Sequence, residues 1–301
     1  MTQQGLTQRG TAQKSVQQED MTKEGITGEA LRSAPLRQRR TAGALLPWVT
    51  TPALVLVLVL AWHAYVERSG ISAFILPPPA AVWDAWTGLI IATQTWRHTA
   101  ATVYETLAGF FWASLIGVGL GVMIGRIRWL ERVINPFVIA TQVVPKVALV
   151  PLLIVWFGFG MPSKIVIAAI FAFFPILTNT VLGVKSLDPG HRDVMISLNA
   201  SRLWVFRRLE LPSAMPYILS GMEVGIVLGL IGAVVGEYLG GNTGLGYLLV
   251  ARMNAYETDM LFAVIVHMTM VGFVFYFGIG AVRQLLIPWH ESVASDHKTR
   301  S

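Results

Sequence analysis

The stretch DPGHRDVMISLNASRLWVFRRLELPSAMPYILSGME, residues 188–223, is the long charged interruption in an otherwise apolar chain. Asp188 followed by proline is a favourable start for a helix, and Asn199 suits the left-handed turn that ends one. Ser201 can cap a second short helix, which we expect Pro212 to end. The stretch therefore predicts two short helices joined by a tight bend, lying outside the membrane between two apolar spans.

The composition around this stretch is that of a membrane protein. Of 301 residues, 54% are hydrophobic and only 13% are charged, against about 25% charged in a typical soluble domain. The net charge of +6 comes from basic residues at the ends of apolar segments, where membrane proteins place them. This distribution argues against a nucleic-acid partner. The absence of cysteine excludes disulfides, zinc–thiolate sites and cysteine catalysis.

Six apolar segments are long enough to cross a bilayer, which takes roughly 20 residues. The first is long and has no small-residue cleavage site, so we expect a retained helix and not a cleaved leader. We therefore predict an all-α membrane protein with a core of five further spans at 102–124, 133–157, 164–184, 217–239 and 261–287. Its predicted parts are a disordered tail (1–43), the first helix (44–66), an interfacial segment (67–100), the core (101–287) with its loop (185–212), and a second tail (288–301).

The predicted interfacial segment lies between the first two spans, on the periplasmic side. The prolines in Leu76-Pro77-Pro78-Pro79 forbid a helix locally. Residues 82–91 then combine aromatic and aliphatic side chains with a single charge, which indicates an amphipathic helix in the interface. We expect Trp83, Trp86 and Trp96 at the level of the lipid headgroups.

The distribution of positive charge predicts the orientation. Lysine and arginine number 18 on the side of the two termini and 4 in the loops on the opposite side. Because cytoplasmic loops of membrane proteins are rich in positive charge, we expect both termini and the charged loop in the cytoplasm.

Small residues recur at every fourth position of two spans, at Gly117, Gly121 and Gly125 and again at Gly221, Gly225 and Gly229. Such spacing lets helix backbones approach closely in a membrane. We favour ordinary packing within the bundle as the interpretation. A homodimer seam through the fifth span is the alternative.

The third span is interrupted by prolines and contains a lysine. Pro145 and Pro151 flank Lys146, and each proline removes a backbone donor that the surrounding protein or a watery cavity has to replace. A lysine at mid-span suggests a role in neutralising an anionic solute or lining its route. Alternatively, the unwound backbone lets Lys146 reach toward an interface. These three residues are our candidates for a translocation path.

The sequence contains no candidate catalytic or metal-binding residues. It lacks a Walker A motif, GxSxG, HExxH and any paired carboxylates in or beside the spans, and its histidines are dispersed. The run GGNTGLGYLL (240–249) superficially resembles a phosphate-binding loop, but we interpret it as a re-entrant hairpin or outer gate. We expect Glu223, Glu237 and His267 to pack against neighbouring helices and not to form a site.

The charged loop resembles the motif of a known family: Glu-Ala-Ala, three residues, Gly, then about nine residues to an apolar–Pro pair. The matching positions are Asp193, Val194, Met195, Asn199 and Leu211-Pro212, followed by Pro216-Tyr217-Ile218 and Gly221. Asp keeps the charge of Glu, and Asn can adopt the bend of Gly. Further similar stretches are LPPP (76–79), PKVALVPLLIVWFGFG (145–160), FFPILTNT (173–180) and GLGYLL (244–249). The chain thus resembles the permease subunit of a bacterial binding-protein-dependent ABC importer, in the nitrate, sulfonate and taurine branch.

This resemblance implies a type I permease fold in the bacterial inner membrane and no cofactor. The implied partners are a second permease subunit, expected to be a homodimer mate, two cytoplasmic ATPase subunits and an extracytoplasmic solute-binding protein. The helices around the bend would couple the chain to the ATPase through Asp193, Val194, Met195, Asn199, Ala200, Ser201 and Pro212. The implied solute is a small anion such as an aliphatic sulfonate, taurine or nitrate.

Three alternatives remain at this point. Relatives that carry neutral heteroaromatics such as thiamine precursors leave that solute class open. A stand-alone carrier or channel would be expected to show inverted repeats or discontinuous helices in matching halves, which are not seen. A DNA-binding helix-turn-helix is disfavoured because some 26 residues between two spans cannot easily reach a major groove.

Overall fold

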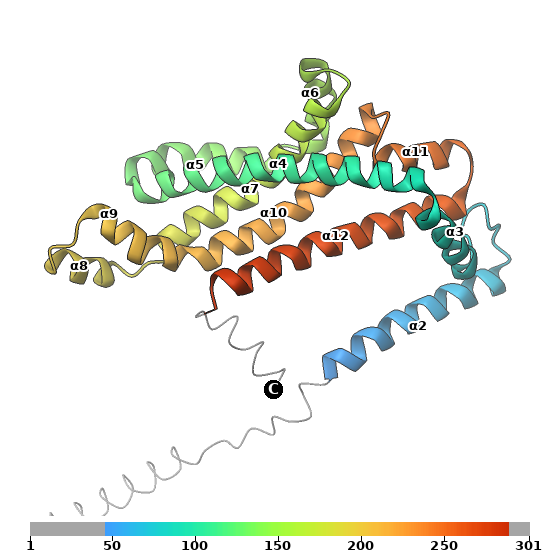
Figure 1. Cartoon of the computed structure of the whole chain (residues 1–301), viewed down its shortest axis with the longest axis horizontal. Coiled ribbons are helices and arrows are strands. Elements are labelled where there is room, and N and C mark those ends of the chain that lie inside the picture. The colour runs from blue at the N-terminus through green and yellow to red at the C-terminus, as the bar shows by residue number, and fades with distance from the viewer. Residues whose placement is uncertain (1–45, 289–301) are drawn as a thin grey trace, which may run out of the picture. The chain divides into compact units, whose positions relative to one another are not determined.

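The computed structural model describes residues 46–288, so the predicted tail 1–43 and all but the first residue of the predicted tail 288–301 lie outside the described residues. The described part is helical and contains no β-strand, which confirms the predicted fold class. The chain divides into two units, of which one ends at Val55 and the other begins at Leu56. The first unit contributes the start of α2, and the second contains the helical bundle (Figure 1).

The helices follow one another with short connections. In chain order they are α2 (Leu46–Ser69), α3 (Pro79–Ile91), α4 (Thr93–Arg126), α5 (Arg128–Val143), the 3₁₀ turn η1 (Lys146–Leu149), α6 (Val150–Phe157), α7 (Met161–Lys185), α8 (Pro189–Ser197), α9 (Arg202–Val205), the π-turn η2 (Phe206–Glu210), α10 (Leu211–Gly240), α11 (Leu245–Asn254) and α12 (Thr258–Leu286). Five of them are long and apolar enough to cross a membrane, and α5 with η1 and α6 can form a sixth, bent span. The predicted interfacial helix is α3, whose first residue is Pro79.

Helix α7 lies between α4 and α10 and packs along both of them (Figure 1). The glycines predicted to allow close approach face α7: a Cβ on Gly121 would lie 2.6 Å from Thr180 Cβ, and one on Gly225 would lie 2.8 Å from Ile176 Cγ1. Ile176 is fully buried between the two glycine faces. The interpretation as ordinary bundle packing is therefore confirmed, since these glycines are occupied within the chain.

The predicted third span is interrupted at its prolines, as expected, because the chain bends by 87° between α5 and the η1–α6 segment. Val144, directly before Pro145, is extended with φ −66° and ψ 126°. A residue before proline is pushed out of the helical region by the proline ring. The helix therefore ends at Val143 and restarts as a 3₁₀ turn at Lys146.

The prediction that Pro212 ends a short helix is wrong. Helical backbone runs from Arg202 to Gly240 through the π-turn η2. Within it, Leu211 N donates to Phe206 O, five residues back. Proline is tolerated in the first turn of a helix, where its missing N–H needs no partner, and the preceding π-turn gives Pro212 such a position.

Candidate functional site

The bend between α8 and α9 is held by the backbone and side-chain contacts that its sequence predicts. Asn199 is left-handed, with φ 58°. Around it Asn199 N donates to Ile196 O at 2.9 Å and Ala200 N donates to Met195 O at 3.1 Å. This pair of bonds is the Schellman pattern, in which a left-handed residue satisfies the last free carbonyls of a helix. The predicted conformation of Asn199 is confirmed.

Side-chain caps fix the start of each of the two short helices. Asp188 Oδ1 accepts a hydrogen bond from Gly190 N at 2.8 Å, before α8. Ser201 Oγ accepts one from Trp204 N at 3.3 Å, before α9. Both caps satisfy backbone N–H groups that have no partner inside the helix. The unit is therefore stiff although it is short.

Helix α8 buries none of its residues. Asp193 is exposed and Met195 is half-buried. The aliphatic side chains are exposed as well: Val194 to 57%, Ile196 to 60% and Leu198 to 72%. Val194 and Leu198 are four residues apart and therefore share one side of the helix, and exposed apolar side chains outside the spans suit a contact with another protein. We call Val194 and Leu198 the α8 apolar face.

The candidate path residues lie where the third span breaks. Lys146 opens η1, and its Nζ lies 4.9 Å from the centre of the Phe174 ring. Among the described residues, no carboxylate pairs with this ammonium group. Lys146 also lines an apolar hollow of about 620 Å³ between α4, α5 and α7. Pro145 and Pro151 direct the backbone there but do not line the hollow.

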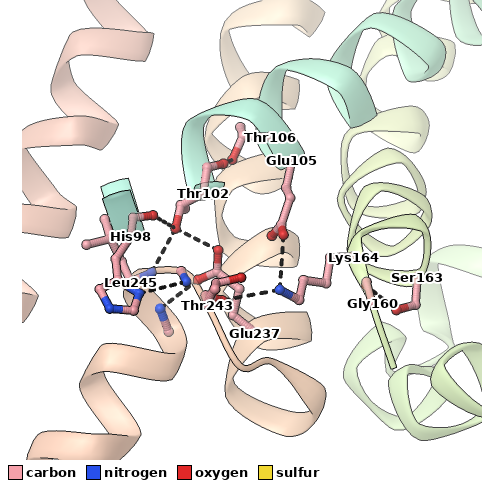
Figure 2. A network of polar contacts seen from close by, with 12 residues as sticks. His98, Thr102, Glu105, Thr106, Gly160, Ser163, Lys164, Glu237, Thr243 and Leu245 are labelled. Carbon is pink, nitrogen blue, oxygen red and sulfur yellow. Dashed lines mark hydrogen bonds and ion pairs between the residues drawn. The ribbon is translucent and has the colours of Figure 1, made fainter. Parts of the chain in front are cut away.

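Inside the bundle, an ion pair that the sequence reasoning missed joins α4 to α7 (Figure 2). Lys164 Nζ lies 3.0 Å from Glu105 Oε1 and also donates to Thr243 O at 3.2 Å. Both side chains are buried, with 0% of Glu105 and 3% of Lys164 exposed. Lys164 is the first residue of the predicted fourth span, and it lies within α7. A charge held inside a membrane bundle needs such a partner.

A second set of polar contacts surrounds the start of α11. The carboxylate of Glu237 accepts hydrogen bonds at both oxygens, from Thr102 Oγ1 at 2.6 Å and from Gly246 N at 2.6 Å. Leu245 N donates to Thr102 Oγ1 at 2.8 Å, and Gly244 N donates to His98 Nδ1 at 3.1 Å (Figure 2). The N–H groups at the start of α11 are thus satisfied by side chains from α4 and α10.

This arrangement explains why the run 240–249 resembles a phosphate-binding loop. The start of a helix attracts an anion because its N–H groups and its dipole point toward it. Here the carboxyl group of Glu237, which belongs to the same chain, occupies that position. Gly244 has φ 108°, and a Cβ there would overlap that carboxylate. The glycine-rich sequence therefore serves an internal contact.

The expectation that Glu223, Glu237 and His267 pack against neighbouring helices is confirmed. Glu223 pairs with Arg283 of α12 at 3.2 Å, and His267 Nε2 lies 3.0 Å from Thr99 Oγ1 of α4. Glu105 was missed although the signal was present, since an ionisable residue inside a predicted span implies a partner or a function. Within residues 46–288, no cluster of three or more His, Asp or Glu side chains is placed to hold a metal ion.

The fold is that of a known class of membrane protein. A chain of the MetNI methionine ABC transporter, solved in inward-facing conformations, superposes with a TM-score of 0.57, covering 63% of this chain and 94% of that one at 18% identity. The arrangement of helices is therefore that of an ABC importer permease.

Sequence comparison identifies the family. Residues 117–289 match the model of the binding-protein-dependent transport system inner membrane component. The chain is 35% identical to the riboflavin transport system permease protein RibX of Chloroflexus aurantiacus, over 82% of this chain and 92% of that one. It is 30% identical to the taurine transport system permease protein TauC of Escherichia coli, over 79% and 88%. Further relatives, 27% to 29% identical, are named as formylaminopyrimidine, aliphatic sulfonate and nitrate permeases.

The chain belongs to the family of binding-protein-dependent ABC importer permeases, in the branch that includes the taurine, sulfonate and nitrate permeases. It is a multi-pass protein of the inner membrane and a transport component, not an enzyme. ATP hydrolysis in such a system belongs to a separate ATPase subunit, and solute is delivered by a binding protein. The resemblance found in the sequence is confirmed.

Proposed function

We propose that this chain imports a small organic anion and that the loop 185–212 couples it to the ATPase subunits. The observation that carries the proposal is the α8 apolar face, which is exposed on a helix that is capped at its start and closed by the Asn199 bend. An apolar surface on a stiff element outside the spans suits a contact through which another protein displaces that element. Asp193 and Met195 belong to the same helix, and Ala200 and Ser201 to the bend.

The coupling role requires that the two short helices move as one piece with the spans. Ser201 caps a helix that continues without a break into α10, so a displacement of the bend is transmitted to a span of 30 residues. Pro212 lies inside this continuous helix and is proposed as part of its junction with the π-turn. In the proposed orientation the loop faces the cytoplasm, where the ATPase subunits are.

The proposed solute follows from the hollow beside Lys146. Its lining is apolar and aromatic, with Trp112, Phe173 and Phe174 among its side chains, and Lys146 supplies the single charge. An ammonium group without a carboxylate partner favours an anion. Apolar walls favour an organic body attached to it, so an aliphatic sulfonate fits better than nitrate. We propose that Lys146 contacts the solute and that Pro145 and Pro151 keep the backbone open beside it.

We also propose that two copies of this chain form the membrane part, so that the path lies between them. The resemblance to the importer family supports a pair of permease subunits. Molecular mass measured on the purified complex in nanodiscs decides between a homodimer and a pair with another permease. A mass that corresponds to one copy of this chain with a different permease would contradict the homodimer.

The neutral heteroaromatic remains a second candidate, because the aromatic side chains of the hollow can stack on a ring. The relative RibX is named for riboflavin, which supports this alternative. Lys146→Met distinguishes the two. It should reduce uptake of an anion strongly and leave uptake of a neutral ring compound nearly unchanged, with the conservative Lys146→Arg as the matched control.

The experiment that tests the function reconstitutes the chain in proteoliposomes with its ATPase subunit and solute-binding protein. Thermal-shift screening of the binding protein against taurine, alkane sulfonates, nitrate, riboflavin and pyrimidines first identifies the solute. Uptake should then require ATP and an ATPase subunit that can hydrolyse it. Val194→Asp should weaken co-purification of the ATPase. The control is Gln94→Asp, an exposed position at the start of α4 and thus at the end of that helix away from Arg126, and it should leave co-purification unchanged. Uptake that persists without any ATPase would overturn the proposal.

A further inference from the structure

A buried carboxylate joins the charged loop to the bundle. Glu210, the last residue of the π-turn η2, keeps only 4% of its side chain exposed. Arg192 Nη2 of α8 donates a hydrogen bond to its Oε1 at 2.7 Å. Arg126 Nε, in the last turn of α4, forms an ion pair with its Oε2 at 3.0 Å. One side chain thus connects α8, α4 and the helix that becomes α10.

The π-turn makes this connection possible. Phe206 and Glu210, the first and last residues of η2, both contact Arg126, whose guanidinium carbon lies 4.9 Å from the centre of the Phe206 ring. A π-turn shifts the direction of the side chains that follow it and is frequently found at functional sites. Here it presents an aromatic ring and a carboxylate to one arginine.

Helix α8 depends on this contact because it has no apolar anchor of its own. None of its residues is buried, and a hollow of about 310 Å³ separates it from α4 and α9, lined in part by Arg126, Arg192, Arg202 and Glu210. Its covalent connections are the segment 186–188 and the Asn199 bend. The Arg192–Glu210 bond is therefore the described side-chain contact that fixes the angle of α8 against the bundle.

We propose that Glu210 is a positioning residue, a clasp that holds α8 to α4 and α10 through Arg192 and Arg126, so that movement of α8 is converted into movement of the spans. This inference rests on the proposed coupling role of the loop. It assigns the transmission of force to three named side chains. Without the clasp, α8 can still bind its partner through its apolar face, but its displacement is absorbed by rotation about the bend.

The test uses the assembled transporter in nanodiscs and proteoliposomes, with the variants Glu210→Gln, Arg192→Gln and Arg192→Lys. The absence of cysteine from the chain allows two cysteines, at Ser197 of α8 and Met123 of α4, to carry spin labels without background. The first readout is the distribution of distances between the labels. The second is the ratio of solute imported to ATP hydrolysed, with radiolabelled taurine and riboflavin as the probes. Arg208→Gln, an exposed arginine of the same π-turn, is the matched control.

We expect Glu210→Gln and Arg192→Gln to broaden the distance distribution and to lower the transport ratio about tenfold, within the range typical of coupling between sites. The ATPase should still co-purify. Arg192→Lys should restore part of the ratio, and Arg208→Gln should change neither readout. Arg192→Gln alters a half-exposed side chain and leaves the Arg126 contact in place, so it separates the clasp from folding.

An unchanged distance distribution in both Arg192→Gln and Glu210→Gln overturns the clasp. The clasp is also overturned if the control variant Arg208→Gln broadens the distance distribution as much as Arg192→Gln does. The broadening would then result from the lost positive charge of the loop alone. If the unmodified transporter shows no ATP-driven uptake, the proposed function fails, and the spin-label distances still decide whether Glu210 holds α8.

Discussion

Lys164→Met removes the cation from the ion pair that joins α4 to α7 inside the bundle. Glu105 is fully buried, and its Oε2 has no hydrogen-bond partner among the described residues. The Lys164 ammonium therefore supplies the main compensation for the carboxylate. Removing one partner of a buried pair costs about 3–5 kcal/mol, since the remaining charge stays buried. We expect a loss of that size in the free energy of unfolding, including the lost bond to Thr243 O.

The matched control is Lys185→Met, at the end of the same helix. Lys185 pairs with Glu131 at 2.5 Å, but half of its side chain is exposed to solvent. Exposed pairs contribute about 0–1 kcal/mol. Both variants therefore remove one lysine of α7 and one ion pair, and they differ in burial. The two losses should differ by about 2–5 kcal/mol on these figures.

The measurement is SDS titration in mixed detergent micelles, followed by tryptophan fluorescence. The double variant Glu105→Leu with Lys164→Met completes a cycle, and it should recover most of the loss because an apolar pair replaces the ion pair. If Lys164→Met destabilised the protein no more than Lys185→Met, the argument that this buried pair holds α4 to α7 would be refuted. A double variant as unstable as the single one would mean that packing, not charge, sets the loss.

Three further predictions concern single backbone positions. Gly244→Ala should destabilise the protein by about 1–3 kcal/mol, because a Cβ at φ 108° overlaps the Glu237 carboxylate. The control Gly88→Ala, whose Cβ meets no atom within 4 Å, should be neutral or slightly stabilising. Thermal unfolding compares the two variants. Asn199→Val should lower uptake with little loss of membrane insertion, since a β-branched residue is strained at φ 58°. Asn199→Gly should keep uptake. Uptake at the wild-type rate by the valine variant would contradict the role of the bend. Gly225→Ala should lower the melting temperature, because its Cβ would lie 2.8 Å from the Ile176 side chain; an unchanged value would mean that α7 and α10 can separate freely.

The features that the sequence predicts correctly are those with a local physical cause. Apolar length determines the spans, and the caps and the left-handed bend follow from the chemistry of Asp188, Ser201 and Asn199 alone. The error in a predicted helix end involves Pro212, whereas the break at Pro145 was expected. Pro145 breaks its helix while Pro212 does not, and the difference is the π-turn before Pro212, which depends on contacts with Arg126 that no local pattern contains.

The polar contacts inside the bundle could not be predicted as pairs. Glu105 and Lys164 are 59 residues apart, and Thr102 and Glu237 are 135 apart. A carboxylate in an apolar span indicates that some partner exists, but its identity depends on how α4, α7 and α10 pack. Lys164 shows the limit clearly. Three residues into its helix, it stands at the predicted start of a span in the sequence, and it has the burial of a core residue in the fold.

The two sets of ion pairs lie toward opposite ends of the same helices, and this bears on how the bundle moves. The glycine faces alone would let α4 slide along α7, since glycine has no side chain that could interlock with the neighbouring helix. The Lys164–Glu105 pair opposes sliding near one end of this helix pair. Near the other end, Lys185 ties α7 to Glu131 of α5, and Arg126 ties α4 to Glu210 at the start of α10. We therefore expect α4, α7 and α10 to move as one rigid block. A push on α8 that reaches Glu210 would then turn the whole block, including the Glu237 contacts that hold the start of α11.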